Sequence, residues 1–145
     1  MADLLVGEDL IAIKDFLDNL ADLGPFSPSI VFHSADDDDP YPLIVLIDAG
    51  TSANETFGYG VASEDAQYII RVITPDTVEK HASEIAFAIH RIITDNLHGN
   101  KIPVSGGFKT LMMKRGPREL SHEEHVSSNE VYLHTGFKWF ASFGK

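Results

Sequence analysis

The apolar residues of this chain recur with two different periods, and the order of those periods constrains the fold more than any other feature. A helical period of three to four residues occurs twice, at residues 8–22 and 76–97, and strand-like segments lie between and after these stretches. Helices and strands in this order favour an α+β layer architecture. We expect one domain over residues 1–145, in the order α-β-β-β-α-β-β, with two helices packed on one face of a mostly antiparallel sheet.

The first helical stretch begins with the acids Glu8 and Asp9, which suit the positive end of a helix dipole. Gly24 and Pro25 stop it, because proline cannot continue a helical hydrogen-bond ladder, so the helix should end near Leu23. Its buried face is predicted from the apolar positions Leu10, Ile13, Leu17 and Leu20.

The second helical stretch begins at Asp76, where Glu79 completes a pattern like a capping box, and ends at Leu97 before His98 and Gly99. His81 and His90 are nine residues apart, about 2.5 turns, so they share no face and are expected on the surface. The buried face is predicted from Val78, Ala82, Ile85, Ile89 and Ile92.

Strands are predicted where β-branched and aromatic residues cluster between turn residues. In the last strand, alternation places Val131, Leu133, Phe137 and Trp139 on a buried face, and places His134 and Lys138 on a wet one. The predicted strands are residues 29–33, 43–47, 67–74, 108–113 and 130–143.

The remaining segments are expected to be connections. Residues 49–66 are rich in glycine and small polar residues and are predicted to form one long loop. Asp36 to Asp39 are read as a solvated loop, because a calcium loop spaces its ligands alternately and needs a glycine turn and a distal glutamate. Gly116 and Pro117 predict a break, followed by a polar loop or hairpin arm at residues 118–125.

Composition narrows the possible functions. Of the 145 residues 43% are apolar, which suffices for a core, and the absence of cysteine excludes disulfides, thiolate metal sites and cysteine nucleophiles. The net charge of −11 disfavours sequence-specific DNA binding. The chain lacks a signal-peptide pattern and a run of ~18 apolar residues, so we expect a soluble protein made in the cytoplasm.

No motif for catalysis, cofactor binding or metal binding stands out. His122 and His125 are three residues apart, whereas a zinc helix of the His-Glu-x-x-His type places its histidines four apart. Ser105 lies in Val-Ser-Gly-Gly, which lacks the strand-turn-helix context of a serine nucleophile. We therefore predict no catalytic residue, no cofactor and no metal, and expect that the protein is not an enzyme.

Four segments together resemble the small tail-completion and tail-terminator proteins of long-tailed bacteriophages. The similarity spans most of the chain, including the first helix, and rests on patterns of apolar and turn residues. The segments are Pro40-Tyr41-Pro42-Leu43-Ile44-Val45-Leu46, Tyr68-Ile69-Ile70-Arg71-Val72-Ile73-Thr74-Pro75, the helix of residues 76–97, and Val131-Tyr132-Leu133-His134-Thr135-Gly136-Phe137-Lys138-Trp139-Phe140.

The resemblance implies a non-catalytic virion protein that forms a homo-oligomeric ring, a hexamer in this family. The ring would cap the tail tube, end tail elongation and join the tail to the head connector. Its partners would be other copies of itself, the major tail tube protein and the head-tail connector proteins. DNA would pass through the channel without specific binding, and no membrane would be involved.

A ring of identical subunits needs two different contact patches on each copy. The candidates are the aromatic residues Phe57 and Tyr59 on one side, and the cations Lys114, Arg115 and Arg118 on the other. Asp36, Asp37, Asp38 and Asp39 are candidate lumen acids, because carboxylates facing a channel would repel passing DNA.

Three other functions fit the sequence. A head-tail connector adaptor would also form a ring and bind other rings. A small metal-dependent hydrolase would be built around His122, Glu123 and His125. An acidic binding module would mimic nucleic acid, although one run of four aspartates does not establish an ordered array of carboxylates.

Overall fold

The computed structural model describes residues 7–33, 41–56, 60–75, 82–104, 110–127 and 130–144. Its content is mixed α+β, as the sequence predicts. The order of elements differs from the prediction, because a short 3-10 helix follows the first helix and a short strand follows the second. The elements are α1 (Glu8–Asp18), η1 (Ala21–Phe26), β1 (Ser29–Phe32), β2 (Leu43–Thr56), β3 (Gly60–Pro75), α2 (Ala82–Leu97), β4 (Lys101–Pro103), β5 (Thr110–Ser127) and β6 (Glu130–Gly144).

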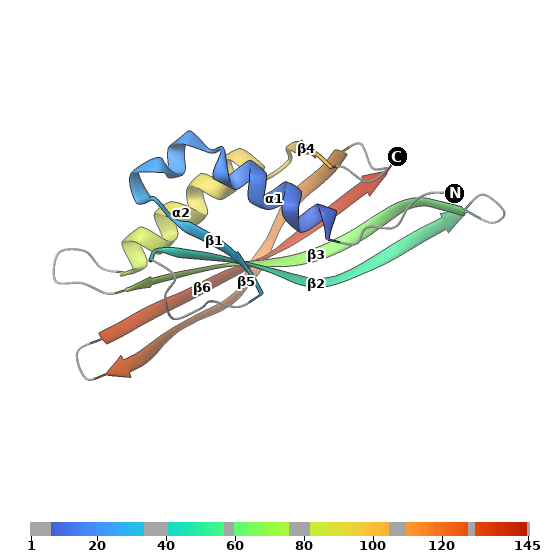
Figure 1. Cartoon of the computed structure of the whole chain (residues 1–145). Helices are drawn as coiled ribbons and strands as arrows, with labels where there is room; N and C mark the ends of the chain where they lie inside the picture. The colour runs from blue at the N-terminus through green and yellow to red at the C-terminus, as the bar shows by residue number, and fades with distance from the viewer. Residues whose placement is uncertain are drawn as a thin grey trace.

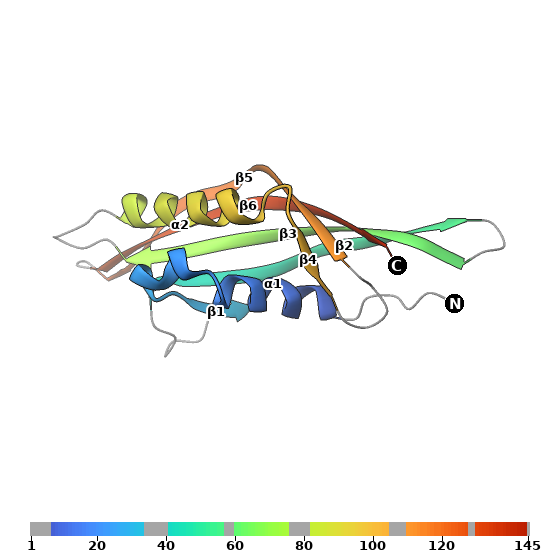
Figure 2. The same ribbon diagram turned by 90° about the horizontal axis from the view of Figure 1, so that it is seen from above.

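The six strands form one sheet in the order β1-β2-β3-β6-β5-β4. β1 pairs with β2 in parallel, and every other neighbouring pair is antiparallel. Figure 1 shows α1 and α2 on the same side of this sheet, and Figure 2 shows both helices from above. The four long strands β2, β3, β6 and β5 therefore form a continuous antiparallel surface.

The main core lies between the two helices and the sheet. α1 contributes Leu10, Ile13 and Leu17, which are at most 8% exposed, as the helical period predicts. Tyr68 and Trp139 are the largest fully buried side chains and come from the two central strands. The other buried members of the core are Leu23, Ile44, Leu46, Ala66, Ile70, Val72, Ala86, Ile89, Ile93, Leu97, Ile102, Val104, Leu111, Met113 and Ala141.

α1 ends earlier than predicted. The helix stops at Asp18, where the backbone and side-chain amides of Asn19 both donate hydrogen bonds to Asp15 O, at 3.2 and 2.8 Å. Gly24 and Pro25 lie inside η1. The α-helix therefore ends at Asp18, with Asn19 as its C-cap, and not near Leu23 as predicted.

α2 is described from Ala82 to Leu97, and the predicted start at Asp76 and Glu79 lies outside the described residues. Ile89 is fully buried, as predicted, but His90 is only 3% exposed and is not a surface residue. The helix ends as expected at Gly99, whose φ of 74° is the left-handed conformation that glycine adopts without steric cost.

The opposite face of the sheet is also partly apolar. Leu43, Val45 and Ile73 form a second buried cluster, against which the half-buried Tyr132 packs. Tyr132 also stacks on Tyr41, with ring centroids 4.8 Å apart. The prediction of a wet face for the last strand is therefore wrong at His134, which is 8% exposed, because the sheet buries side chains on both faces at this position.

Two predicted connections are strands. Within the predicted loop of residues 49–66, residues 49–56 belong to β2 and residues 60–66 to β3, and these strands pair from Leu43 with Ile73 to Thr56 with Gly60. Register shifts after Asp48 and after Asn54 interrupt this ladder. The segment has no apolar alternation, so the pattern that identifies half-buried strands could not detect it.

The predicted break at Gly116 and Pro117 is also wrong. Both residues lie inside β5, at a register shift between Arg115 and Arg118. Residues 118–125 continue the strand and pair with β6, so the hairpin-arm alternative predicted for them is confirmed. Bulges are places where a strand accommodates proline, because the missing N–H removes no regular ladder bond there. A Cβ at Gly116 would lie 2.4 Å from Phe140 Cε2, so the lack of a side chain lets that ring rest on the β5 backbone.

Candidate assembly surfaces

Two hairpins extend the sheet at opposite ends. We call residues 48–56 of β2 with residues 60–67 of β3 the β2 arm, and residues 118–127 of β5 with residues 130–137 of β6 the β5 arm. Figures 1 and 2 show these hairpins pointing in opposite directions along the sheet. The antiparallel registers of the two hairpins hold the arms together.

β1 flanks the beginning of β2. The two strands pair from Leu43 to Leu46, and the backbone N–H of His33 adds one further hydrogen bond to Leu46 O, at 2.9 Å. β2 continues beyond this pairing to Thr56, along β3.

β4 and the end of α2 flank the beginning of β5. β4 pairs with residues 110–112 of β5, and Met113 adds backbone hydrogen bonds to Gly99 and Asn100. The N–H of Arg115 donates to His98 Nδ1 at 2.9 Å. β5 continues beyond these contacts to Ser127, along β6.

The predicted cations do not form one cluster. Lys114, Arg115 and Arg118 are all exposed, but Lys114 and Arg115 are consecutive in a strand and point to opposite faces. Lys114 is paired with the exposed Phe140, whereas Arg115 is paired with the buried Trp139. Lys114 and Arg115 are adjacent in the sequence, but their side chains lie on opposite faces of β5.

Arg115 is engaged within its own chain. Its guanidinium carbon lies 4.7 Å from the ring centroid of Phe137, and Nη1 donates to Thr94 Oγ1 at 3.5 Å. Together with the backbone bond to His98, these contacts attach β5 to α2 and β6. Arg118, on the far side of the bulge, is the cation that the β5 arm itself carries.

The other predicted site residues lie outside the described residues. These are the aromatic candidates Phe57 and Tyr59, and the candidate lumen acids Asp36, Asp37, Asp38 and Asp39. Ser105 and His81 also lie outside them. Of the histidine and acid group proposed for a hydrolase, the structure places His122, Glu123 and His125 in the β5 strand, with Glu123 exposed.

A buried acid joins α1 to the sheet. Asp9 is 2% exposed and accepts a hydrogen bond from the hydroxyl of Tyr68, which is 1% exposed. The sequence assigned Asp9 to the helix dipole alone. A buried acid that accepts a hydrogen bond from a tyrosine across the core fixes the position of α1 on β3.

His90 joins α2 to β6. Its Nε2–H donates to Thr135 O at 2.9 Å, and its ring contacts Phe137 edge-on, with centroids 4.7 Å apart. Burial lowers the pKa of His90 from 6.5 to about 4; the hydrogen bond to Thr135 opposes this shift, and the charge of Arg115 adds to it. His90 is therefore neutral near pH 7 and acts as a structural residue.

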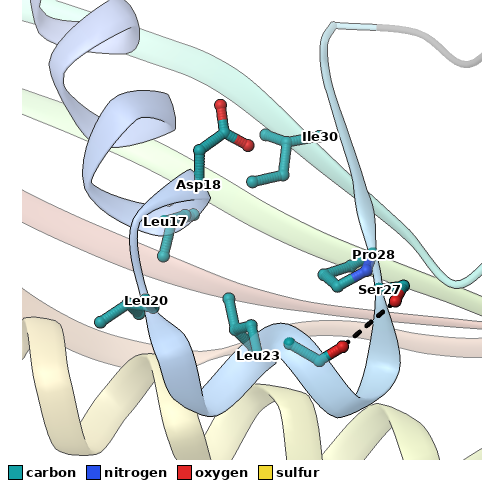
Figure 3. Close-up of a pocket in the computed structure, with 8 residues that line it drawn as sticks. Leu17, Asp18, Leu20, Leu23, Ser27, Pro28 and Ile30 are labelled. Carbon is teal, nitrogen blue, oxygen red and sulfur yellow. Dashed lines mark hydrogen bonds between the residues drawn. The ribbon is translucent and has the colours of Figure 1, made fainter.

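A shallow pocket of about 180 Å³ lies between the end of α1, η1 and the start of β1 (Figure 3). Asp18 carries the one ionisable side chain in its lining, and Lys14 Nζ lies 2.6 Å from Asp18 Oδ2. Ser27 Oγ donates to Gly24 O at 3.1 Å, so the serine hydroxyl serves the turn. Lys14 is not part of the lining, so the pocket itself holds no basic side chain beside Asp18. The other lining residues are Leu17, Leu20, Leu23, Gly24, Pro28 and Ile30.

The described residues contain no group of three or more His, Asp or Glu side chains that could hold a metal ion. None of the helices within the described ranges combines the length and the hydropathy that a membrane span needs.

Sequence reasoning missed the strands of the β2 arm. Pattern analysis finds strands through the burial of one face, and the Thr, Ser, Asn and Glu residues of the β2 arm carry no such pattern. The usable signal was the clustering of β-compatible Thr residues between glycines at 50–60, which is weak on its own.

The fold of this chain is similar to that of a chain in a solved structure. No protein-family model and no curated protein sequence matches the chain. A search of solved structures finds a similar chain in the virion of a native gene transfer agent particle, with a TM-score of 0.54 and 18% sequence identity. The match covers 93% of this chain and 93% of that chain, so the two have the same fold over nearly their whole lengths.

Proposed function

We propose that this protein is a structural subunit of a phage or phage-like virion. It forms a ring that caps the tail tube, ends tail elongation and joins the tail to the head connector. The observation that carries this proposal is the likeness in fold, over 93% of both chains, to a chain of a gene transfer agent virion. The sequence resemblance to tail-terminator proteins, which involves different evidence, supports the same assignment.

The structure offers two features that suit an assembly subunit. Each copy extends two different hairpins, the β2 arm and the β5 arm, in opposite directions, and a ring of identical subunits needs two different surfaces. Within the described residues, the pocket and the buried polar groups serve packing, and none combines a nucleophile with a base. A non-enzymatic role in the virion is therefore part of the proposal.

Electron microscopy of the purified chain, alone and mixed with isolated tail tubes, tests this function when combined with a measurement of solution mass. Rings, or added density at tube ends, are the expected result. A chain that stays monomeric at every concentration and never binds a tube would contradict the proposal. Rings that bind purified connector complexes and ignore tubes would instead assign the chain to a connector adaptor.

A further inference from the structure

Three polar side chains of α2 recur at every fourth residue and contact the strands β5 and β6. The ring nitrogen Nε2 of His90 bonds to Thr135 O of β6, and Thr94 Oγ1 accepts a hydrogen bond from the guanidinium of Arg115 in β5. His98 accepts the backbone N–H of Arg115 at its ring nitrogen Nδ1. Residues four apart lie on one face of a helix, so α2 directs a polar row at these strands.

The end of α2 holds Arg115 twice. Its backbone N–H lies 2.9 Å from His98 Nδ1, and its Nη1 lies 3.5 Å from Thr94 Oγ1, one helical turn earlier. Arg115 is also the last residue of β5 in regular register with β6 before the shift that leads to Arg118. The α2 contacts therefore hold β5 at the bulge from which the β5 arm starts.

The bond from Arg115 fixes the protonation of the His98 ring. A backbone N–H only donates, so Nδ1 of His98 accepts and carries no proton. In a neutral imidazole the one ring proton then sits on Nε2. A charged imidazole carries a proton on both nitrogens and accepts at neither. The bond between Arg115 and His98 therefore exists only while His98 is neutral.

Solvent can reach the His98 ring, because this residue is exposed, and histidine is the side chain whose charge changes between about pH 5 and 8. The closed contact binds one proton fewer than the open one, so it is favoured at high pH and lost as the pH falls. We propose that His98 is a pH-sensitive latch, which ties β5 to α2 while neutral and releases β5 at its bulge when protonated. This proposal goes beyond the proposed function and does not depend on it.

The charges around His98 favour release once the ring is protonated. β6 meets the ring with Trp139, which carries no charge, at 6.5 Å between ring centroids. The charged residues of the last two turns of α2, of β4 and of the adjoining part of β5 are Arg91, Asp95, Lys101 and Arg115, with Lys114 on the opposite face of β5. Among these residues cations outnumber the one acid, so a further positive charge is disfavoured there.

The neighbouring contacts do not titrate in the same range. Gly99 N–H donates to Met113 O at 2.7 Å, and Met113 N–H donates to Asn100 O at 3.3 Å, so both acceptors are carbonyl oxygens. Burial lowers the pKa of His90 to about 4, which keeps that ring neutral at pH values where the latch opens. Release should therefore be confined to Arg115, and the amide of Met113 provides an internal reference.

NMR of the full chain at about pH 8 and about pH 5.5, on either side of histidine protonation, tests the latch. At the higher pH, a scalar coupling across the hydrogen bond should join Arg115 N to His98 Nδ1, and His98 should carry its ring proton on Nε2. At the lower pH this coupling should be absent. The protection of the Arg115 amide against hydrogen exchange should fall by about fivefold relative to that of Met113.

Two variants identify the titrating group. His98→Asn places a carboxamide oxygen close to the position of Nδ1 and has no proton to gain, so the Arg115 amide should stay protected at both pH values. His98→Ala removes the acceptor, so that amide should be poorly protected at both. In both variants the pH dependence of the ratio between Arg115 and Met113 should disappear, and Met113 protection shows that the strand remains folded.

Fluorescence gives a second readout that does not depend on the size of an assembly. Trp139 is the one tryptophan of the chain, and its ring lies edge-on to that of His98. A charged imidazole quenches indole emission more strongly than a neutral one. The emission of the parent should therefore change over the same pH range as the protection of Arg115, and both His98 variants should lack this change.

The outcomes decide the proposal without reference to rings or tail tubes. Coupling and Arg115 protection that are lost together in the parent, with no pH dependence in the two variants, would support the latch. A ring proton on Nδ1 of His98 at the higher pH would overturn it, as would constant protection of Arg115 in the parent. PH dependence that persists in both variants would assign the transition to another group and overturn the role of His98.

Discussion

The centre of the sheet and its two arms belong to the same four long strands, yet different forces hold them. At the centre, Ile70 and Val72 are fully buried between helices and sheet, and the opposite face buries Leu43 and Ile73. The arms extend from this centre in opposite directions as ladders of paired strands. A side-chain core therefore stabilises the centre, whereas ladder hydrogen bonds shape the arms.

The largest effect should come from a charge placed in the centre. Ile89→Asp buries a carboxylate without a partner in a site that is 0% exposed, and it should lower the free energy of unfolding by about 3–5 kcal/mol. Phe87→Asp is the matched control, since Phe87 on the same helix is 41% exposed and should cost about 1 kcal/mol. Urea unfolding of both variants measures the difference, and equal losses would show that α2 does not bury the face assigned to it.

A smaller effect should appear on acidification. The pKa of His90 is about 4 when folded and near 6.5 when unfolded, so unfolding takes up a proton between these values. The stabilisation is complete above pH 6.5 and is lost as the pH falls toward 4, by at most about 3 kcal/mol. The stability difference between the parent and His90→Gln, followed by urea unfolding from pH 7 to pH 4, should shrink over this window. A constant difference would contradict the assignment.

The smallest energies should govern the arms. Amides of the β2 arm that face β3, such as Ser52, should exchange hydrogen through local openings of ~0–2 kcal/mol, because they lie beyond the residues of β2 that pair with β1. Amides of Ile70 and Val72, in the centre, should exchange only through much larger unfolding. Hydrogen exchange followed by NMR makes this comparison residue by residue. Equal protection in both regions would mean that the arms belong to the cooperative core.

The predictions that held are those in which burial imposes a period on the sequence. The apolar face of α1, the burial of Ile89 and the end of α2 at Gly99 all follow from local pattern and local backbone preference. The predictions that failed depended on partners distant in sequence. His90 and His134 look like surface residues until β6 and the second apolar cluster are in place around them.

The sequence by itself determined the α+β content, the helical faces and the strongly apolar strands. Burial of one face makes apolar residues recur about every 3.6 residues in a helix and every 2 in a strand, and this period can be recognised in the sequence. Only the tertiary structure decided that residues 49–56, 60–66 and 116–125 are strands, because their ladder bonds are made by backbone groups that every residue carries. It also placed Lys114 and Arg115 on opposite faces of β5. Such features arise from strand order and register, which no local pattern encodes.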